Sequence, residues 1–270
     1  MRQAGVGHTV QRRVFGTRKL GCYLEAQQAV VDSIEEVAAD LLGFCTDILS
    51  ASGEQATTYL LIGTERGFCG DFNHALPRRL ESMLQAHPPN HARLITAGHE
   101  LHVLLEDDER VAARIEGTSE AEEVTAVLNP LVNELSKLHE AHGPGSVQCL
   151  YHGADDMVLQ ELLPPFKNLR HAPPQFAHPP ELNQPPGDFL LELTGHYLVA
   201  ALHRILYTSL MAENHHRIAH LDGAVRHLDN EAAELTRRCN ALRQEEIVEE
   251  IKVIPLSAAS LGSEAGKWDH

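Results

Sequence analysis

In the last third of the chain the apolar residues recur at alternating steps of three and four. No proline lies between Pro186 and Pro255, so one helix over residues 186–254 is compatible with the backbone. Read as heptads, the apolar line has leucine at every d position, which is typical of a coiled-coil seam. Its members are Ile218, Leu221, Val225, Leu228, Ala232, Leu235, Cys239 and Leu242. The spacing predicts a long helix that needs a partner along its length. The alternative is a buried helix of an all-α bundle.

A second apolar line with the same spacing lies near the start of the chain. No proline interrupts residues 8–50, and we expect an N-terminal coiled-coil helix within residues 1–52. Gln27 is its one polar member, and a polar residue in a seam can fix the register. The apolar members are Leu20, Tyr23, Val30, Ile34, Val37, Leu41, Phe44 and Ile48. Seams at both ends of one chain predict that the terminal helices pack on each other, antiparallel, with a compact domain inserted between them.

Between the two seams, residues 53–185 alternate short β-rich runs with helical segments. The expected strands are 57–63, 93–97, 111–115 and 147–151, and the expected helices are 73–85, 100–105 and 118–141, the last interrupted or kinked at Pro130. Strands that alternate with helices indicate a largely parallel sheet covered on both faces. The predicted fold class is therefore α/β, with a Rossmann-like domain inserted into a long antiparallel coiled coil of the N- and C-terminal helices.

Two segments are expected to lack regular structure. Residues 164–186 contain eight prolines and connect the α/β domain to the C-terminal helix. Residues 255–270 are small and polar, and we expect a disordered tail there.

Charge and composition narrow the function. The chain has a net charge of −16, and residues 51–185 carry 9 basic against 19 acidic residues. An acidic surface of this kind argues against nucleic acid as a partner, because binding phosphates needs lysine and arginine. Residues 1–20 carry five basic residues and no acidic one, which suits an acidic protein surface or anionic lipid. No apolar run reaches the roughly 18–20 residues that span a bilayer.

One distinctive string, residues 63–73 (GTERGFCGDFN), follows an expected strand and opens an expected helix. This is the position at which α/β proteins bind phosphates, but the string contains neither GxGxxG nor GK[ST]. A tight turn whose glycines allow positive φ explains it more simply. Cys69 as a nucleophile would need a base, and only His74 is within reach in the sequence.

Histidines and cysteines give no clear metal or redox motif. His216 and His220 lie one helical turn apart, yet no HExxH is present, so we expect solvated or interface histidines and no metal site. The five cysteines form no CxxC pair, and Cys45 and Cys239 sit at helical apolar positions that predict buried thiols in a reducing compartment.

Three separated segments resemble one known family. Residues 64–73 (TERGFCGDFN) are similar to the strand–loop–helix signature of the γ subunit of F-type ATP synthases, usually written with Gly-Leu-Cys-Gly-Gly. Residues 209–224 (SLMAENHHRIAHLDGA) are similar to the family pattern ESxxSExxARMxAMxxA, and residues 239–251 (CNALRQEEIVEEI) to YNxxRQxxITxEI. Asp71 replaces the family's second motif glycine. The GFCGDF variant and the short middle domain resemble the sodium-type side branch of F-type ATPases.

The resemblance implies a rotor shaft. In that family the coiled coil stands inside the ring of α and β subunits, and the α/β domain rests on the membrane-embedded c-ring beside an ε-type subunit. It implies a peripheral location on the cytoplasmic face of a bacterial plasma membrane, one copy in the complex, no cofactor bound by this chain, and no catalytic residue on it, since ATP chemistry belongs to β.

Matched position by position, the resemblance also implies contacts that couple rotation to the β subunits. Arg66 matches the arginine that faces the acidic lever of a β subunit, and a guanidinium suits a carboxylate partner. Arg243 and Gln244 match an Arg-Gln pair that binds a β-subunit loop. The motif loop itself is represented by Gly67, Cys69, Gly70 and Asn73.

Two other functions remain compatible with the residues. One is an α/β ligand-binding domain with a coiled-coil dimerisation arm, and the other is a metal-dependent enzyme that uses the histidines.

Overall fold

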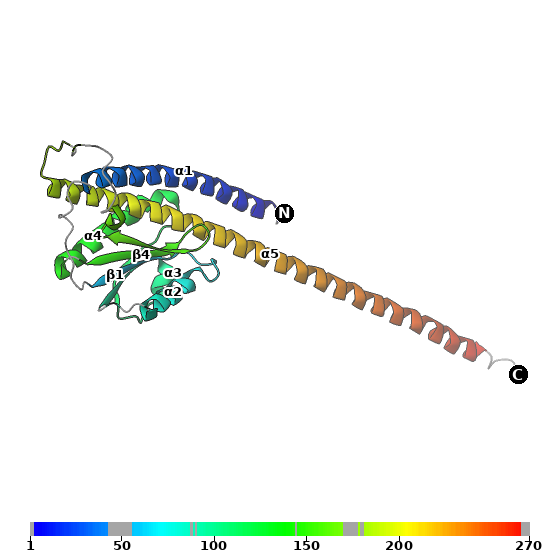
Figure 1. The fold of residues 1–270 in the computed structure, drawn as a ribbon. Coiled ribbons are helices and arrows are strands. Elements are labelled where there is room, and N and C mark those ends of the chain that lie inside the picture. Colours follow the sequence, from blue (N-terminus) through cyan, green and yellow to red (C-terminus); the bar gives the residue numbers. More distant parts are fainter. Residues whose placement is uncertain are drawn as a thin grey trace. The chain divides into compact units, whose positions relative to one another are not determined.

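The computed structural model describes residues 3–42, 56–86, 89, 91–143, 145–169, 178 and 181–265, with side chains in α1 from residue 19 onward. The chain divides into two units, residues 1–220 and residues 221–270, and each is described by itself. Unit 1 contains a sheet and the helices that cover it (Figure 1). Of the described helices, none is long and apolar enough to span a bilayer.

The sheet of unit 1 has five strands in the order β3-β2-β1-β4-β5. The strands are β1 (Thr57–Ile62), β2 (Ala92–Ala97), β3 (Val111–Ile115), β4 (Ser146–His152) and β5 (Met157–Leu163). The first four are parallel, with Leu60 of β1 opposite Ile95 of β2 and Cys149 of β4. The expected strands are therefore confirmed, and so is the largely parallel sheet.

Strand β5 was not predicted. It pairs antiparallel with β4, from Val147 opposite Leu163 to His152 opposite Met157. Its sequence, MVLQELL, does not alternate cleanly between apolar and polar residues because both of its faces are only partly buried. A short turn, in which the Gly153 N–H donates to the Asp156 carbonyl at 2.7 Å, joins it to β4.

Helices cover both faces of the sheet. On one face α2 (Phe72–Ala86) and α3 (His99–Leu104) bury Leu76, Leu80 and Leu101 against Tyr59 and Leu61 of β1. The other face carries α4 (Val124–His142) together with parts of α1 and α5. Helix α4 follows a 3₁₀ turn, η2 (Ala121–Glu123). It continues through Pro130, so the helix is not interrupted there.

Helix α1 (Gln3–Leu42) packs antiparallel on the first part of α5 (Pro186–Ala265), as Figure 1 shows. Tyr23 stacks on Tyr207 with ring centroids 5.3 Å apart, and Arg204 Nη1 donates to Gln28 Oε1 at 3.2 Å. The residue numbers rise along α1 as they fall along α5, so the two helices run in opposite directions. The expected residues 43–50 of this helix, with Phe44, Cys45 and Ile48, lie outside the described residues.

The buried face of α1 agrees with the predicted seam only in part. Val31, Ala38 and Leu42 are buried, whereas Val30 and Val37 are 45% and 44% exposed. Of the other predicted seam positions, Leu20 and Leu41 are buried, Ile34 is partly buried and Tyr23 is 38% exposed. The buried residues of α1 belong to a core cluster that also contains residues of α4, α5 and the sheet, so its buried face is wider than a two-helix seam.

Helix α5 continues into unit 2 and corrects two expectations. It runs through Pro255 to Ala265, where we expected a disordered tail. Leucine and alanine, which favour helices, are frequent in residues 256–265, although Pro255 offers no N–H to the preceding turn. Cys239, expected to be buried, is exposed.

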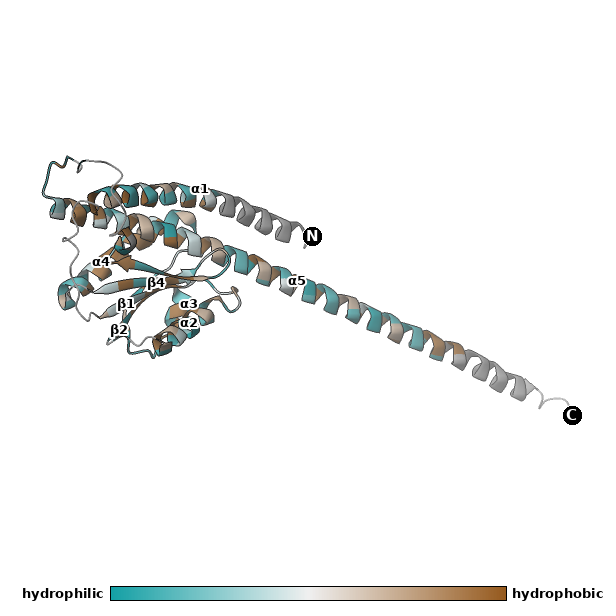
Figure 2. Ribbon diagram, in the orientation of Figure 1, coloured by the Kyte–Doolittle hydropathy of each residue, from teal (hydrophilic) through white to brown (hydrophobic). Residues whose placement is uncertain are grey.

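The apolar seam of α5 is exposed in unit 2. Leu221, Val225, Leu228, Leu235 and Leu242 are 37%, 39%, 62%, 60% and 64% exposed, and Ile218, just before the unit boundary, is partly buried. Figure 2 shows hydrophobic residues spaced among hydrophilic ones along α5. A coiled-coil partner for this stripe remains a prediction.

Candidate functional site

The loop between β1 and α2 lies where the order of the strands in the sheet reverses. Strand β1 has β2 on one side and β4 on the other, so the chain leaves β1 at a topological switch point. In open α/β sheets, functional residues gather outside the carboxyl ends of the strands at such a point. Residues 63–71, which carry the distinctive string, form this loop.

The loop is closed at its base by Thr64 and Asn73. The Thr64 N–H donates to Asn73 Oδ1 at 2.9 Å, and Asn73 Nδ2 donates to Thr64 Oγ1 at 2.8 Å. Thr64 is fully buried. Asn73 at the start of α2 therefore fixes the two ends of the loop to each other, a role that its place in the motif did not reveal.

Gly98 allows a second loop to approach this base closely. It has φ of 109°, and a Cβ there would lie 2.8 Å from the Thr64 carbonyl oxygen. Any larger residue at position 98 would push apart the loops that follow β1 and β2.

The loop presents Arg66 and Phe68 to solvent. Arg66 is exposed, and Phe68 is 75% exposed with φ of 65°, a conformation that is rare for an aromatic residue. Gly67 between them is partly buried, and Gly70 has φ of 61°. A strained backbone that exposes an aromatic ring beside a guanidinium is typical of a binding surface. Phe68 is a functional candidate that the sequence did not suggest.

Cys69 faces inward under the same loop. Its thiol is within 3.6 Å of the carbonyl oxygens of both Arg66 and Gly67. Burial raises the pKa of Cys69, which disfavours the thiolate that a nucleophile needs. His74 is exposed at the surface of α2. The structure thus favours a structural thiol over a catalytic one.

A buried ion pair on α5 lies beneath the loop. Arg217 binds Glu213, and their side chains are only 7% and 3% exposed. Arg217 Nη2 also donates to the Arg66 carbonyl oxygen at 3.2 Å. Burial raises the pKa of Glu213 to about 7, although Arg217 pulls it down. The spacing of four between Glu213 and Arg217 was the available sequence signal for this pair.

An aromatic contact joins the loop to β4 and α5. His152 stacks on Phe72 with ring centroids 3.8 Å apart, and His216 meets the edge of Phe72 at 5.3 Å. His152 Nε2 lies 2.9 Å from the Phe72 carbonyl oxygen, which can only accept, so this nitrogen carries the hydrogen. Burial lowers the pKa of His152 and favours the neutral ring.

His216 is thus engaged with aromatic rings. Within the described residues, no group of three or more histidine, cysteine, aspartate or glutamate side chains is arranged to hold a metal ion. The pair His216 and His220 therefore lacks a third ligand in the part of the chain that the structure describes.

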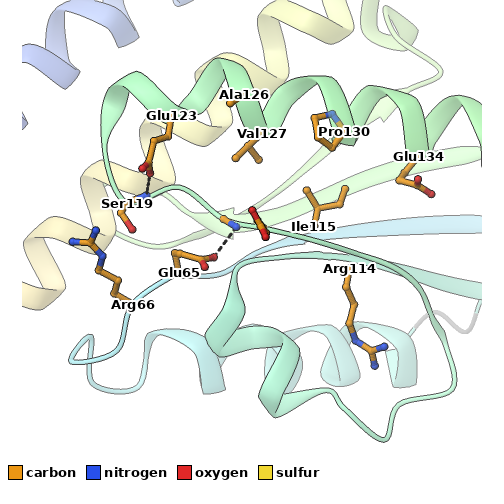
Figure 3. A pocket seen from close by; sticks show the side chains of 12 residues that line it. Glu65, Arg66, Arg114, Ile115, Ser119, Glu123, Ala126, Val127, Pro130 and Glu134 are labelled. Carbon is orange, nitrogen blue, oxygen red and sulfur yellow. Dashed lines mark hydrogen bonds between the residues drawn. The ribbon is translucent and has the colours of Figure 1, made fainter.

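An open pocket of about 740 Å³ lies beside the loop, between β3 and α4 (Figure 3). Glu65 Oε2 accepts the backbone N–H groups of Gly117 at 2.7 Å and His99 at 3.1 Å. Four glutamates and two arginines line the pocket: Glu65, Glu116, Glu123, Glu134, Arg66 and Arg114. An excess of carboxylates does not suit a phosphate group, in agreement with the absence of both nucleotide motifs.

The remaining predicted contact residues lie in unit 2. Arg243 and Gln244 are exposed on α5. The structure brings neither of them into contact with a described residue through a side-chain hydrogen bond, and their role as contacts stays a prediction.

The fold and the loop define a class: an α/β domain whose sheet is packed against antiparallel terminal helices, the second of which continues beyond it. A family model described as ATP synthase matches residues 16–261. The chain therefore belongs to the ATP synthase family.

Within this family the relatives found are γ chains. The chain is 22% identical over 249 residues to the ATP synthase gamma chain of Clostridium botulinum strain Langeland, covering 88% of this chain and 85% of the relative. A chain of the Tetrahymena thermophila mitochondrial ATP synthase central stalk and c-ring superposes with a TM-score of 0.52 at 14% identity, over 79% of this chain and 99% of that one. A chain of the Euglena gracilis mitochondrial ATP synthase in rotational state 3 gives 0.51 at 16% identity, over 96% and 97%.

Proposed function

We propose that this chain is the γ subunit of an F-type ATP synthase or ATPase, the central rotor shaft that couples ion-driven rotation of a c-ring to ATP synthesis or hydrolysis at β-subunit sites. The observation that carries the proposal is the family match, which extends over residues 16–261 and so includes α1 from residue 16 onward, the sheet and nearly all of α5. A match to the α/β domain alone would have left the terminal helices unexplained.

The structure supports a mechanical function for α5. Its first part supplies Ala201, Leu202 and Ile205 to the core of unit 1, where each is fully buried. The same helix then carries the apolar stripe of unit 2. Because the one helix α5 belongs to both units, a torque applied to either unit is transmitted to the other through the hydrogen-bonded backbone of this helix.

Partner contacts follow from the exposed residues. Arg66 on the loop and Arg243 with Gln244 on α5 are proposed to contact the β subunits, and the stripe from Leu221 to Leu242 is proposed to pair in a coiled coil with α1 or to face the collar of α and β subunits. The α/β domain is proposed to rest on the c-ring beside an ε-type subunit, on the cytoplasmic face of a bacterial plasma membrane.

The chain is proposed to contribute no catalytic group. The buried Cys69 and the carboxylate-lined pocket offer neither an activated nucleophile nor a phosphate site. ATP hydrolysis would then take place on the β subunits, and this chain would alter the affinity of each site as it turns.

Co-assembly tests the proposal directly. The purified chain is mixed with its cognate α and β subunits, and the product is followed by size-exclusion chromatography and ATPase assay. We expect no ATP hydrolysis by the chain alone, and a complex with one copy of it that hydrolyses ATP. Failure to bind the α and β subunits would refute the assignment. A stable homodimer of the free chain in light scattering would instead support the ligand-binding module with a dimerisation arm.

A further inference from the structure

The carbonyl oxygen of Arg66 is held from two directions while its side chain stays exposed. Thr64 Oγ1 donates to this oxygen at 3.0 Å from within the loop. Arg217 Nη2 donates to it at 3.2 Å from α5. The backbone that carries the exposed guanidinium is therefore fixed to the loop's own base and to the helix.

Arg217 reaches this carbonyl in a defined orientation because of Glu213. The same nitrogen, Nη2, binds Glu213 Oε1 and the Arg66 carbonyl oxygen. Nη2 has two hydrogens, so each acceptor takes one, and the carboxylate directs the second hydrogen toward the loop. Since Glu213 lies one turn before Arg217 on the same helix, this orientation does not depend on any other element.

Burying two charges needs an explanation beyond stability. A buried ion pair often contributes little to folding, because desolvation offsets the attraction between the charges. Two well-packed apolar residues at positions 213 and 217 would serve the core as well. They could not, however, donate a hydrogen bond to a loop carbonyl.

The same stretch of α5 contacts the loop at further points. Ala212 forms a buried cluster with Cys69 and Phe72, and His216 packs on the edge of the Phe72 ring. The loop is thus attached to one helical turn and a half of α5 by apolar, aromatic and hydrogen-bond contacts.

We infer that Glu213 and Arg217 are positioning residues for Arg66, which fasten its loop to α5 so that a force on the Arg66 side chain is transmitted to the helix. This inference rests on the proposed function of Arg66 as a contact with the β subunits. Neither residue touches the partner in this scheme; both act through the Arg66 backbone.

A double-mutant cycle in the assembled complex tests it. Arg66→Ala, Arg217→Met and the double variant are incorporated into complexes in membrane vesicles, and the ratio of ATP-driven ion uptake to ATP hydrolysis is measured for each. We expect each single variant to lose about half or more of the coupling ratio, and the double variant to lose no more than Arg66→Ala alone, because residues that act through one contact are not additive.

Control variants separate positioning from general stability. Arg78→Met removes an exposed ion pair to Asp71 on the same loop and is expected to leave the ratio unchanged. Glu213→Gln keeps an oxygen acceptor for Arg217 and is expected to retain more coupling than Glu213→Leu. If Arg217→Met does not assemble, Arg217→Lys, which keeps a cation for Glu213, replaces it in the cycle.

The outcomes distinguish the inference from the proposed function. The positioning role would be overturned if the position-217 variant lowered the coupling ratio equally in the wild-type chain and in the Arg66→Ala chain, or did not lower it at all. Arg66 would then remain as a contact. An unchanged ratio in Arg66→Ala would overturn both the contact and the positioning role. Failure of the wild-type chain to bind the α and β subunits would remove the rotor assignment itself.

Discussion

Two leucines on α5 allow a matched test of where this helix has a packed partner. Leu202 is fully buried in unit 1, whereas Leu228 in unit 2 is 62% exposed. Each is changed to alanine, so the chemical change is the same at both sites. Any difference in stability then reports the surroundings of the side chain.

The expected magnitude follows from the burial. Leu202→Ala removes three buried carbon groups, about 2.4 kcal/mol at roughly 0.8 kcal/mol for each CH₂. The cavity left behind raises the loss to between about 2.7 and 5 kcal/mol. Leu228→Ala should change the free energy of unfolding by no more than about 0.5 kcal/mol, as is usual for surface positions.

Urea unfolding of the purified chain, followed by far-UV circular dichroism, measures both values. A thermal scan should show the same order, with a midpoint shift of roughly 2–4 °C for each kcal/mol in a unit of this size. A loss for Leu228→Ala equal to that for Leu202→Ala would refute the reasoning. It would show that the stripe of unit 2 is packed in the free chain, as the heptad pattern predicts for an internal coiled coil.

Three further predictions concern chemistry, pH and the helix backbone. Iodoacetamide should modify the exposed Cys239 rapidly in the native chain, but the buried Cys69 only after denaturation. Peptide mass spectrometry can follow the modification of each cysteine. Rapid labelling of Cys69 in the native chain would contradict its burial. The pKa of Glu213 rises on folding from 4.5 to about 7, so its stabilising contribution is complete below pH 4.5 and is lost as the pH rises to 7. Between pH 5 and 8 the wild-type chain should therefore lose stability relative to Glu213→Gln, and parallel pH profiles in urea titrations would argue against the raised pKa. Leu228→Pro should abolish coupling in the complex, because an interior proline destabilises a helix by about 3 kcal/mol or more. The unfolding of unit 1 should stay unchanged. Intact coupling in this variant would show that the helix around Leu228 is not needed to transmit torque.

Much of the fold could be read from periodicity. The runs around Leu60, Ile95 and Cys149 are short and mostly apolar because parallel strands are buried on both faces, and this signal survives in a single sequence. Strand β5 carries a weaker signal, since it lies at the sheet edge and pairs antiparallel. Helix α5 continues through Pro255, where a proline rule gave the wrong end.

The candidate site was predictable only in part. The string around Arg66 identified the loop, but nothing in it indicates which atoms hold it in place. The contacts of Arg217 with Arg66 and of His152 with Phe72 join residues 151 and 80 positions apart. Such contacts depend on tertiary packing, which local spacing does not encode. The buried face of α1 was predicted only in part for the same reason: Leu20 and Leu41 are buried as expected, whereas Val30 and Val37 are exposed, because this helix belongs to a core cluster with more than one other element.

The way α5 enters the core of unit 1 has a consequence for biosynthesis. Arg204 and Gln28, which join α5 to α1, are 176 residues apart, so the cover that α4 begins on this side of the sheet cannot be completed until the ribosome has made most of the chain. At about 5–20 residues per second, α1 and the strands wait many seconds with their apolar faces open to water. Long-range closure of this kind also slows folding after release. The nascent chain should therefore depend on a holding chaperone, and truncation before residue 200 should yield an aggregating product rather than a smaller soluble domain.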